Sequence, residues 1–183
     1  MYHRYADEMS VEEHKKEAGK SKFAILTIST SRYAKYGGLK NPDLCEDTSG
    51  KIIRDILTAH GHICVDYSLV PDDVEKIRMS ILNFISSETN AIICTGGTGL
   101  APGDVTIESI KPLLEKEIPG FGELFRLKSM NQIGSAAMLT RALGGVVKGK
   151  VVFCLPGSPE AVSLAINELI LPEIGHILKH LKD

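Results

Sequence analysis

Short runs of apolar residues alternate along the chain with longer segments in which apolar residues recur every three or four positions. The first pattern is typical of buried strands, and the second is typical of amphipathic helices. Their alternation predicts βαβ units, and hence an α/β protein with a three-layer α/β/α fold and a mostly parallel sheet. The expected strands are residues 23–28, 62–69, 91–95 and 150–155.

Capping residues and apolar spacing locate the expected helices. One begins with Asp47 or Thr48 as its cap and ends at Gly61, and the next opens at residues 71–73. Residues 29–46 are expected to form a long loop of the kind that often carries function. Later helices are expected near Thr106, around residues 123–131 after a break at 119–122, and from Pro159 onward with Ser158 as cap and a kink near Pro172.

Length and composition predict one globular domain. The 183 residues suit a single domain, and 43% hydrophobic with 24% charged residues is typical of folded proteins. Residues 1–20 contain few apolar positions and mixed charges. We therefore expect an N-terminal arm over residues 1–20, followed by the domain over residues 21–183.

Charge and hydropathy restrict the partners. The 21 Lys and Arg against 23 Asp and Glu give a net charge of -2, which argues against nucleic acid or an anionic membrane surface as a partner. No apolar run approaches the length of about 18 residues that spans a bilayer. The charged N-terminus differs from a secretory signal. These features predict a cytoplasmic protein.

The cysteines and histidines show no recognisable metal or disulfide spacing. His176 and His180 are four positions apart but have no third ligand nearby, so surface side chains are expected. Cys45 lies in a polar segment, where a reactive thiol is an alternative to a structural role. The cysteines in apolar runs, which are expected to be buried small hydrophobic residues, are Cys64, Cys94 and Cys154.

The strongest chemical signal is the run Thr95, Gly96, Gly97, Thr98 and Gly99, directly after an expected buried strand. Ligands bind at the carboxyl edge of parallel sheets, and glycines allow the positive φ and close approach that an anion nest needs. The two threonine hydroxyls are candidate ligand donors beside the nest. The run is not a Walker A loop, because no Gly-Lys-Ser/Thr follows it. The alternative is a tight turn without a ligand.

Asp72 and Asp104 follow two expected strands at this same edge. Taken singly, each is expected to cap the next helix. Together, two carboxylates beside a phosphate nest would repel the ligand unless a Mg²⁺ ion lay between them. Two other strand ends carry candidate binding residues: Ser29, Thr30 and Ser31 after the first strand, and Pro156, Gly157, Ser158 and Pro159 after the last.

The order of these motifs resembles the MoaB/MogA family of molybdenum cofactor biosynthesis proteins. The resemblance covers residues 22–178. Within this range, the segment 119–123, which ends at Glu123, is a further motif of the family. Residues 47–50 make the chain more similar to MoaB than to MogA. The resemblance implies the molybdopterin-binding (MogA-like) fold.

The resemblance also implies an activity, in which AMP passes from Mg-ATP to the terminal phosphate of molybdopterin and pyrophosphate is released. Asp72 and Asp104 match the two important aspartates of the family and would act with Mg²⁺, and Glu123 matches a third motif position. Members form homotrimers, and some MoaB-type members form homohexamers. A metal-inserting MoeA-type protein is an expected partner.

Two alternatives to this enzyme remain open at the sequence level. One is a molybdopterin-binding scaffold without efficient catalysis, since Leu100 and Ile107 replace prolines that MogA-type enzymes often have. The other is a different enzyme that shares the domain, such as a CinA-like nucleotide hydrolase or a MoeA protein. Those proteins normally carry the domain within longer chains.

Overall fold

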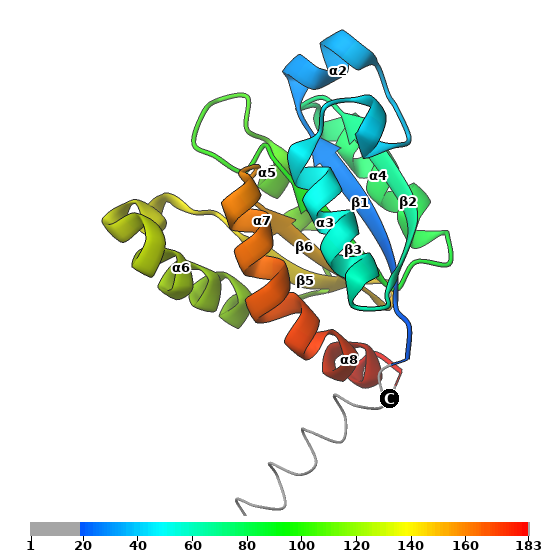
Figure 1. Cartoon of the computed structure of the whole chain (residues 1–183), viewed down its shortest axis with the longest axis vertical. Helices are drawn as coiled ribbons and strands as arrows, with labels where there is room; N and C mark the ends of the chain where they lie inside the picture. Colours follow the sequence, from blue (N-terminus) through cyan, green and yellow to red (C-terminus); the bar gives the residue numbers. More distant parts are fainter. Residues whose placement is uncertain (1–18, 183) are drawn as a thin grey trace, which may run out of the picture.

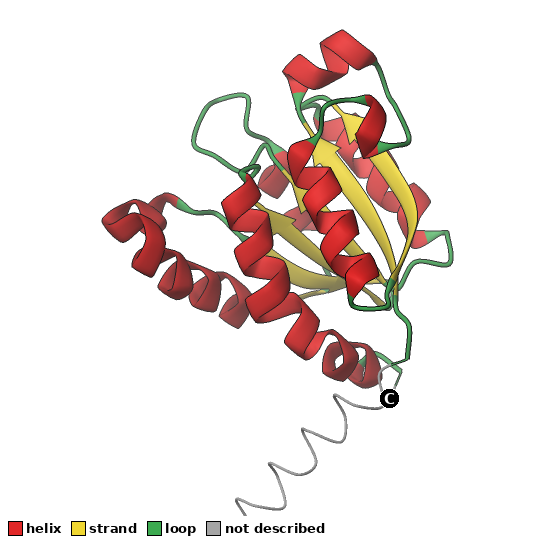
Figure 2. Ribbon diagram, in the orientation of Figure 1, coloured by secondary structure: helices red, strands yellow, loops and turns green. Residues whose placement is uncertain are grey.

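The computed structural model of the chain describes residues 19–182. A six-stranded sheet lies between helices on both of its faces (Figures 1 and 2). The predicted N-terminal arm lies, except for its last two residues, outside the described residues. The strands are β1 (Lys22–Ile28), β2 (Ile63–Val70), β3 (Ala91–Thr95), β4 (Lys116–Glu117), β5 (Leu143–Val147) and β6 (Lys150–Leu155). The α-helices are α2 (Thr30–Tyr36), α3 (Thr48–Ala59), α4 (Val74–Ile85), α5 (Thr106–Ile110), α6 (Pro119–Ile133), α7 (Pro159–Ala165) and α8 (Leu171–His180).

The strand order is β2-β1-β3-β6-β5-β4. The first four strands in this order are parallel, whereas β5 and β4 are antiparallel to their neighbours. The predicted mostly parallel sheet is therefore confirmed. The sequence pattern missed β5 because Gly144 and Gly145 interrupt its apolar alternation. A tight turn at Lys148 and Gly149, both with positive φ, joins β5 to β6 as a hairpin.

Successive side chains of the central strands point to opposite faces of the sheet and belong to two separate hydrophobic cores. Phe23 and Ile25 of β1 belong to the core on the side of α3 and α7, and Ala24 and Leu26 belong to the core on the side of α4. Figure 1 shows α3 and α7 in front of the sheet and α4 behind it. Helices therefore cover both faces of the parallel part of the sheet.

Two element predictions were wrong. The segment 29–46 is not a continuous loop, because it contains α2 and a short 3₁₀ turn, Pro42–Leu44. Helix α2 has no buried residue and therefore no apolar stripe to reveal it. Helix α6 begins at Pro119, a residue that suits the first helical turn, so the expected break at 119–122 lies within the helix.

The expectation that no apolar segment is long enough to span a bilayer was wrong for the C-terminal helical segment. Pro159–His180 is 22 residues long and apolar enough, by length and composition only, to cross a membrane. Five of its inward residues are at most 1% exposed in the core beside the sheet, which identifies it as a core helix. Ahead of Pro172, where a kink is expected, the segment contains a π-helical turn, Ile166–Ile170. The five inward residues are Val162, Ala165, Ile166, Ile170 and Ile174.

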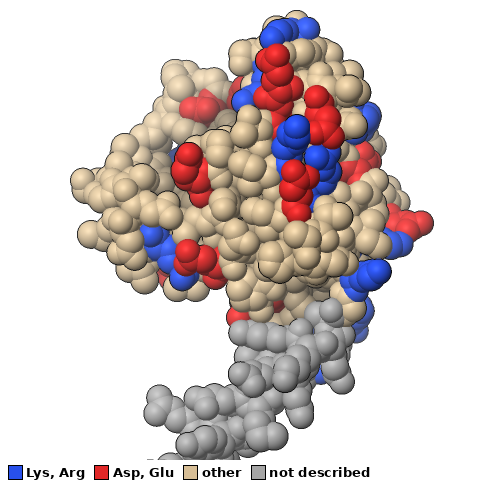
Figure 3. Space-filling model, viewed as in Figure 1, with Lys and Arg blue, Asp and Glu red and all other residues tan. Residues whose placement is uncertain are grey.

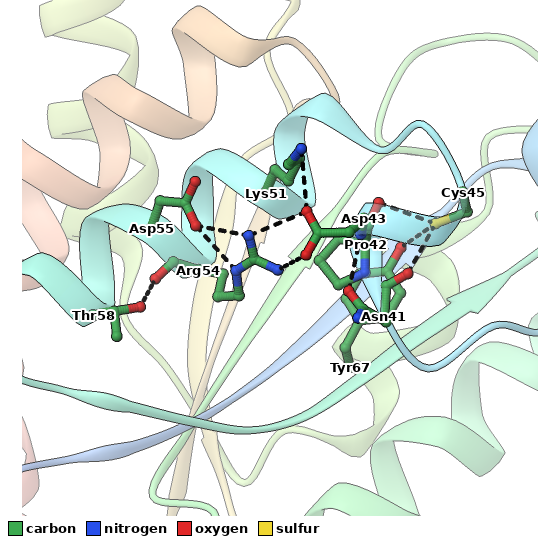
Figure 4. A network of polar contacts seen from close by, with 9 residues as sticks. All are labelled: Asn41, Pro42, Asp43, Cys45, Lys51, Arg54, Asp55, Thr58 and Tyr67. Atoms are coloured by element: carbon green, nitrogen blue, oxygen red, sulfur yellow. Dashed lines mark hydrogen bonds and ion pairs between the residues drawn. The ribbon is translucent and has the colours of Figure 1, made fainter.

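The cysteines are structural in character. Cys94 and Cys154 are fully buried neighbours on β3 and β6, and Cys64 is half-buried. Burial raises the pKa of the Cys64 thiol to about 11, so the thiol is protonated at neutral pH. Cys45 is also fully buried, which counts against a reactive thiol, and its Sγ lies 3.2 Å from the hydroxyl oxygen of Tyr67 (Figure 4).

A buried carboxylate joins β1, β2 and the start of α3. Asp47 is fully buried, and its Oδ2 accepts hydrogen bonds from the hydroxyls of Thr27 at 2.6 Å and Tyr67 at 2.8 Å. Its Oδ1 accepts from the amide of Gly50 at 3.1 Å, so Asp47 is also the predicted helix cap. A Cβ on Gly50 would lie 2.1 Å from Oδ2. The network thereby fixes where α3 begins relative to the sheet.

We expect Asp47→Ala to lower the free energy of unfolding by about 3 kcal/mol, because it removes a cap and leaves two buried hydroxyls without their acceptor. Urea denaturation followed by far-UV circular dichroism measures this loss. Asp73→Ala is the matched control, because it removes the exposed cap of the equally long helix α4. That control should cost about 1 kcal/mol, and equal losses in the two variants would contradict a special role for the buried network.

Candidate functional site

The carboxyl ends of the four parallel strands meet at one edge of the sheet. Ile28 at the end of β1 pairs with Val70 at the end of β2. Thr95 at the end of β3 pairs with Thr27 on one side and Leu155 of β6 on the other. The segments that follow these strands therefore leave the sheet side by side. This edge contains all the candidate residues that were predicted to follow strands.

The turn after β3 passes between its two neighbouring strands without room for a side chain. Gly96 has a φ of 95°, and a Cβ on it would lie 2.2 Å from the carbonyl oxygen of Ile28. On the other side, its amide donates to the carbonyl of Leu155 at 3.1 Å. Gly97 has a φ of 60°, and a Cβ there would lie 2.5 Å from Oδ1 of Asp72. Only glycine suits this path.

Asp72 lies against the glycine turn and is not a helix cap. Its Oδ2 accepts hydrogen bonds from Thr30, at 3.1 Å from the amide and 2.7 Å from the hydroxyl. The Thr30 hydroxyl in turn accepts from the Asp72 amide at 3.0 Å. The cap of α4 is the next residue, Asp73, which accepts from the amide of Lys76 at 2.9 Å. When Asp72 was considered on its own, it was expected to cap this helix, and that expectation was wrong.

Asp104 closes the loop that continues from the glycine turn. Its Oδ2 accepts from the amide of Ala101 at 2.9 Å, and its own amide donates to the carbonyl of Ala101 at 2.9 Å. A Cβ on Gly99 would lie 2.6 Å from the same carboxylate oxygen. Helix α5 has no side-chain cap, because its N-cap position is Val105. Asp104 is thus not a cap either.

The glycine turn presents unused amide donors. Within residues 19–182, the amides of Gly97, Thr98 and Gly99 donate to no backbone or side-chain acceptor. The neighbouring carbonyls are already used, because Gly97 accepts from the amide of Thr106 at 3.0 Å and Thr98 accepts from Arg141 Nε at 2.9 Å. Free amides beside satisfied carbonyls are the arrangement of an anion nest.

The turn after β6 is held against the glycine turn. A Cβ on Gly157 would lie 3.3 Å from the Cα of Gly96. The hydroxyl of Thr95 donates to the carbonyl of Pro156 at 3.0 Å, so this hydroxyl is used within the protein and is not a free ligand donor. The hydroxyl of Ser49, at the start of α3, donates to the carbonyl of Gly157 at 2.7 Å.

The remaining candidates differ in their positions. Ser158 caps α7, as predicted, and accepts from the amide of Ala161 at 3.2 Å. Ser29 caps α2. Ser31 is exposed on α2, and its hydroxyl lies 3.4 Å from that of Ser29. Glu123 is exposed on α6 and makes no hydrogen bond or ion pair with the described part of the chain.

The two carboxylates suit a hard cation such as Mg²⁺. Asp72 Oδ1 and Asp104 Oδ1 accept no hydrogen bond from any residue between 19 and 182. The described residues contain no cluster of three or more His, Cys, Asp or Glu side chains that could hold a metal. Mg²⁺ usually takes one or two protein carboxylates together with waters and substrate phosphates. The donor set therefore fits a metal that arrives with a phosphate ligand.

On the face that Figure 3 shows, acidic and basic side chains are interspersed. A cavity of about 630 Å³ beside β2 includes Arg54, which is ion-paired with Asp43 (Figure 4), and it contains none of the candidate residues. A second cavity, of about 360 Å³, lies near Ser21 and Asn90 at the opposite end of the sheet.

The chain is similar to known proteins of molybdenum cofactor biosynthesis. The model of the probable molybdopterin binding domain matches residues 24–176. Molybdenum cofactor biosynthesis protein B of Bacillus cereus is 46% identical over 92% of this chain and 96% of its own length. A molybdopterin adenylyltransferase of Pyrococcus furiosus is 44% identical over 96% of this chain and 100% of its own length. The crystal structure of a molybdenum cofactor biosynthesis protein B, 42% identical, superposes with a TM-score of 0.81 over 90% of this chain and 98% of that chain.

The chain belongs to the MoaB/MogA family of molybdenum cofactor biosynthesis proteins. The predicted family and fold are therefore confirmed.

We expect Gly97→Ala to lower the free energy of unfolding by about 2 kcal/mol or more, because alanine is strained at positive φ and its Cβ would collide with Asp72 and Thr106. Gly103→Ala is the control within the same loop, since nothing lies within 4 Å of its Cβ position. This control should change stability by less than about 0.5 kcal/mol. Similar urea midpoints for the two variants would show that the turn tolerates a side chain.

Proposed function

We propose that this protein transfers AMP from Mg-ATP to the terminal phosphate of molybdopterin and releases pyrophosphate. The observation that carries the proposal is the pair Asp72 and Asp104 on the glycine turn, each with one carboxylate oxygen unused by the described residues. The similarity to a protein named molybdopterin adenylyltransferase supports the same reaction. This function makes the protein a nucleotidyltransferase whose substrates are ATP and molybdopterin.

The reaction needs positioning and charge neutralisation more than proton transfer. The nucleophile is a phosphate oxygen, which is already ionised at neutral pH, so no general base is required. Asp72 and Asp104 would hold Mg²⁺ through their free oxygens, and the ion, when bound, supplies positive charge for the pyrophosphate leaving group. The free amides of residues 97–99 would bind phosphate oxygens as oriented donors.

The second turn offers a place for another anionic group. Helix α7 begins there, at the same edge of the sheet as the glycine turn, and of its first residues Pro159 has no amide while Ala161 donates its amide to Ser158. Ser49 and Thr95 hold the carbonyls of Gly157 and Pro156, which orients this turn without consuming its amides. We assign the binding of the two substrates to these adjacent turns, together with Thr30 beside Asp72.

We expect Asp104→Asn to lower the rate of pyrophosphate release by at least about 100-fold, because the amide keeps the contact to Ala101 but loses the negative charge that binds Mg²⁺. The rate is measured with purified protein, molybdopterin, ATP and Mg²⁺. The melting temperature should stay unchanged. Asp73→Asn, at the adjacent helix cap, is the control and should retain most of the rate.

The outcomes of this assay separate the two functions of the family. Pyrophosphate release that Asp104→Asn removes supports the transferase. Tight binding of molybdopterin by the wild type without release would instead support a scaffold that binds and does not turn over. Release that Asp104→Asn leaves unchanged would contradict the assigned metal role.

We also propose that the protein is a cytoplasmic homo-oligomer, a trimer or a hexamer, that passes its product to a metal-inserting MoeA-type protein. Helix α6 and the following 3₁₀ segment, Gly134–Leu139, expose six large apolar side chains, each between 49% and 78% exposed. Apolar surfaces of this kind are usually covered by a partner. The six residues of this apolar face are Leu124, Leu127, Met130, Ile133, Met138 and Leu139.

We expect Leu127→Glu to shift the protein from the oligomer to the monomer, because a carboxylate buried in an apolar contact is strongly unfavourable. Size-exclusion chromatography with light scattering measures the mass. Met79→Glu is the control, since Met79 is similarly exposed, at 57%, but lies on α4. An oligomer that survives Leu127→Glu would exclude this face as the contact.

A further inference from the structure

Arg141, which precedes β5, spans both ends of the loop that carries the unused amides and Asp104. Its Nε donates to the carbonyl of Thr98 at 2.9 Å, and its Nη2 donates to the carbonyl of Asp104 at 3.2 Å. The rest of the guanidinium is paired with both carboxylate oxygens of Glu108 on α5. A single side chain thus fixes two carbonyls that lie six residues apart in the chain.

The contacts of Arg141 orient the groups on the other side of each peptide. In a trans peptide, the carbonyl and the following amide point in opposite directions. Holding the carbonyl of Thr98 therefore aims the amide of Gly99 away from Arg141. Holding the carbonyl of Asp104 fixes the backbone from which its carboxylate projects.

The positive charge of Arg141 is neutralised by an ion pair within the protein. Its side chain is 27% exposed, and Glu108 provides a bidentate partner. The hydrogen bond from Arg141 holds the pKa of the Glu108 carboxyl below its usual value, so this pair is ionised at neutral pH. The guanidinium therefore acts on the site through the loop backbone and does not serve as a free cation for an anionic substrate.

We propose that Arg141 is a positioning residue of the adenylyl-transfer site, which holds the loop between Thr98 and Asp104 in the conformation that presents the Gly99 amide and the Asp104 carboxylate. This inference rests on the proposed function. A planar fork with several fixed donors is needed to reach two carbonyls and one carboxylate together. Lysine has one ammonium group and cannot replace these contacts.

The test is Arg141→Lys, which keeps the charge and removes the fork. We expect hydrogen exchange of the two hydrogen-bonded loop amides, those of Ala101 and Asp104, to become about 10-fold faster. We also expect the Mg²⁺ concentration for half-maximal pyrophosphate release to rise about 10-fold, as for supporting residues around metal ligands. Saturating Mg²⁺ should restore most of kcat. A general loss of stability would lower kcat without changing the Mg²⁺ requirement.

Arg78→Lys is the matched control. Arg78 also donates to a backbone carbonyl, that of Ser109 at 3.2 Å, and also pairs with a glutamate, Glu75, but it does not contact the loop. It should leave both loop exchange and the Mg²⁺ requirement unchanged. Glu108→Gln, which weakens one side of the fork, should give an intermediate effect in both measurements.

The two proposals fail in different ways. If the wild type releases no pyrophosphate, the proposed function fails, and loop exchange alone then decides the role of Arg141. Unchanged exchange in Arg141→Lys overturns the positioning role in every case. A lower kcat with unchanged exchange and an unchanged Mg²⁺ requirement would also overturn it.

Discussion

The path of the backbone through Gly96 is the constraint on which the candidate site depends. At this residue the chain leaves the central strand between the ends of β1 and β6, and the carbonyl oxygen of Ile28 lies only 2.2 Å from where a Cβ would be. Because the turn is this close to its neighbours, Gly157 can pack against it and Asp72 can approach Gly97. A side chain at position 96 would separate the strand ends and move each of these groups apart.

The same edge shows how the fold distributes donors and acceptors. The turn carbonyls are satisfied by side chains from distant elements: Thr106 donates to Gly96, Arg141 to Thr98, and Ser49 to Gly157. Carbonyl oxygens that are turned toward the protein carry their negative partial charge away from the edge. The outward groups are amides and two carboxylates, so the edge suits an anion that brings a cation with it.

Local pattern predicted the features that depend on local spacing. The four parallel strands and the caps at Asp47 and Ser158 could be predicted, because periodicity and capping act over a few residues. The meeting of Asp72 and Asp104 at one edge followed from the parallel order of the sheet. The roles of Ser49 and Arg141 could not be predicted, because their contacts join residues 108 and 43 positions apart.

Three aspartates illustrate why residue type alone could not assign the roles in the site. Asp47 is fully buried, and the fold satisfies both of its oxygens with three donors. Asp72 and Asp104 are partly exposed at the edge, and the described residues donate hydrogen bonds to only one oxygen of each. A carboxylate whose two oxygens both accept hydrogen bonds from the protein stabilises the fold. A carboxylate with only one such oxygen is held in a fixed orientation, and its other oxygen can still bind a metal ion. Burial and the number of donors, which only the three-dimensional structure supplies, therefore distinguish the structural aspartate from the two candidates for metal binding.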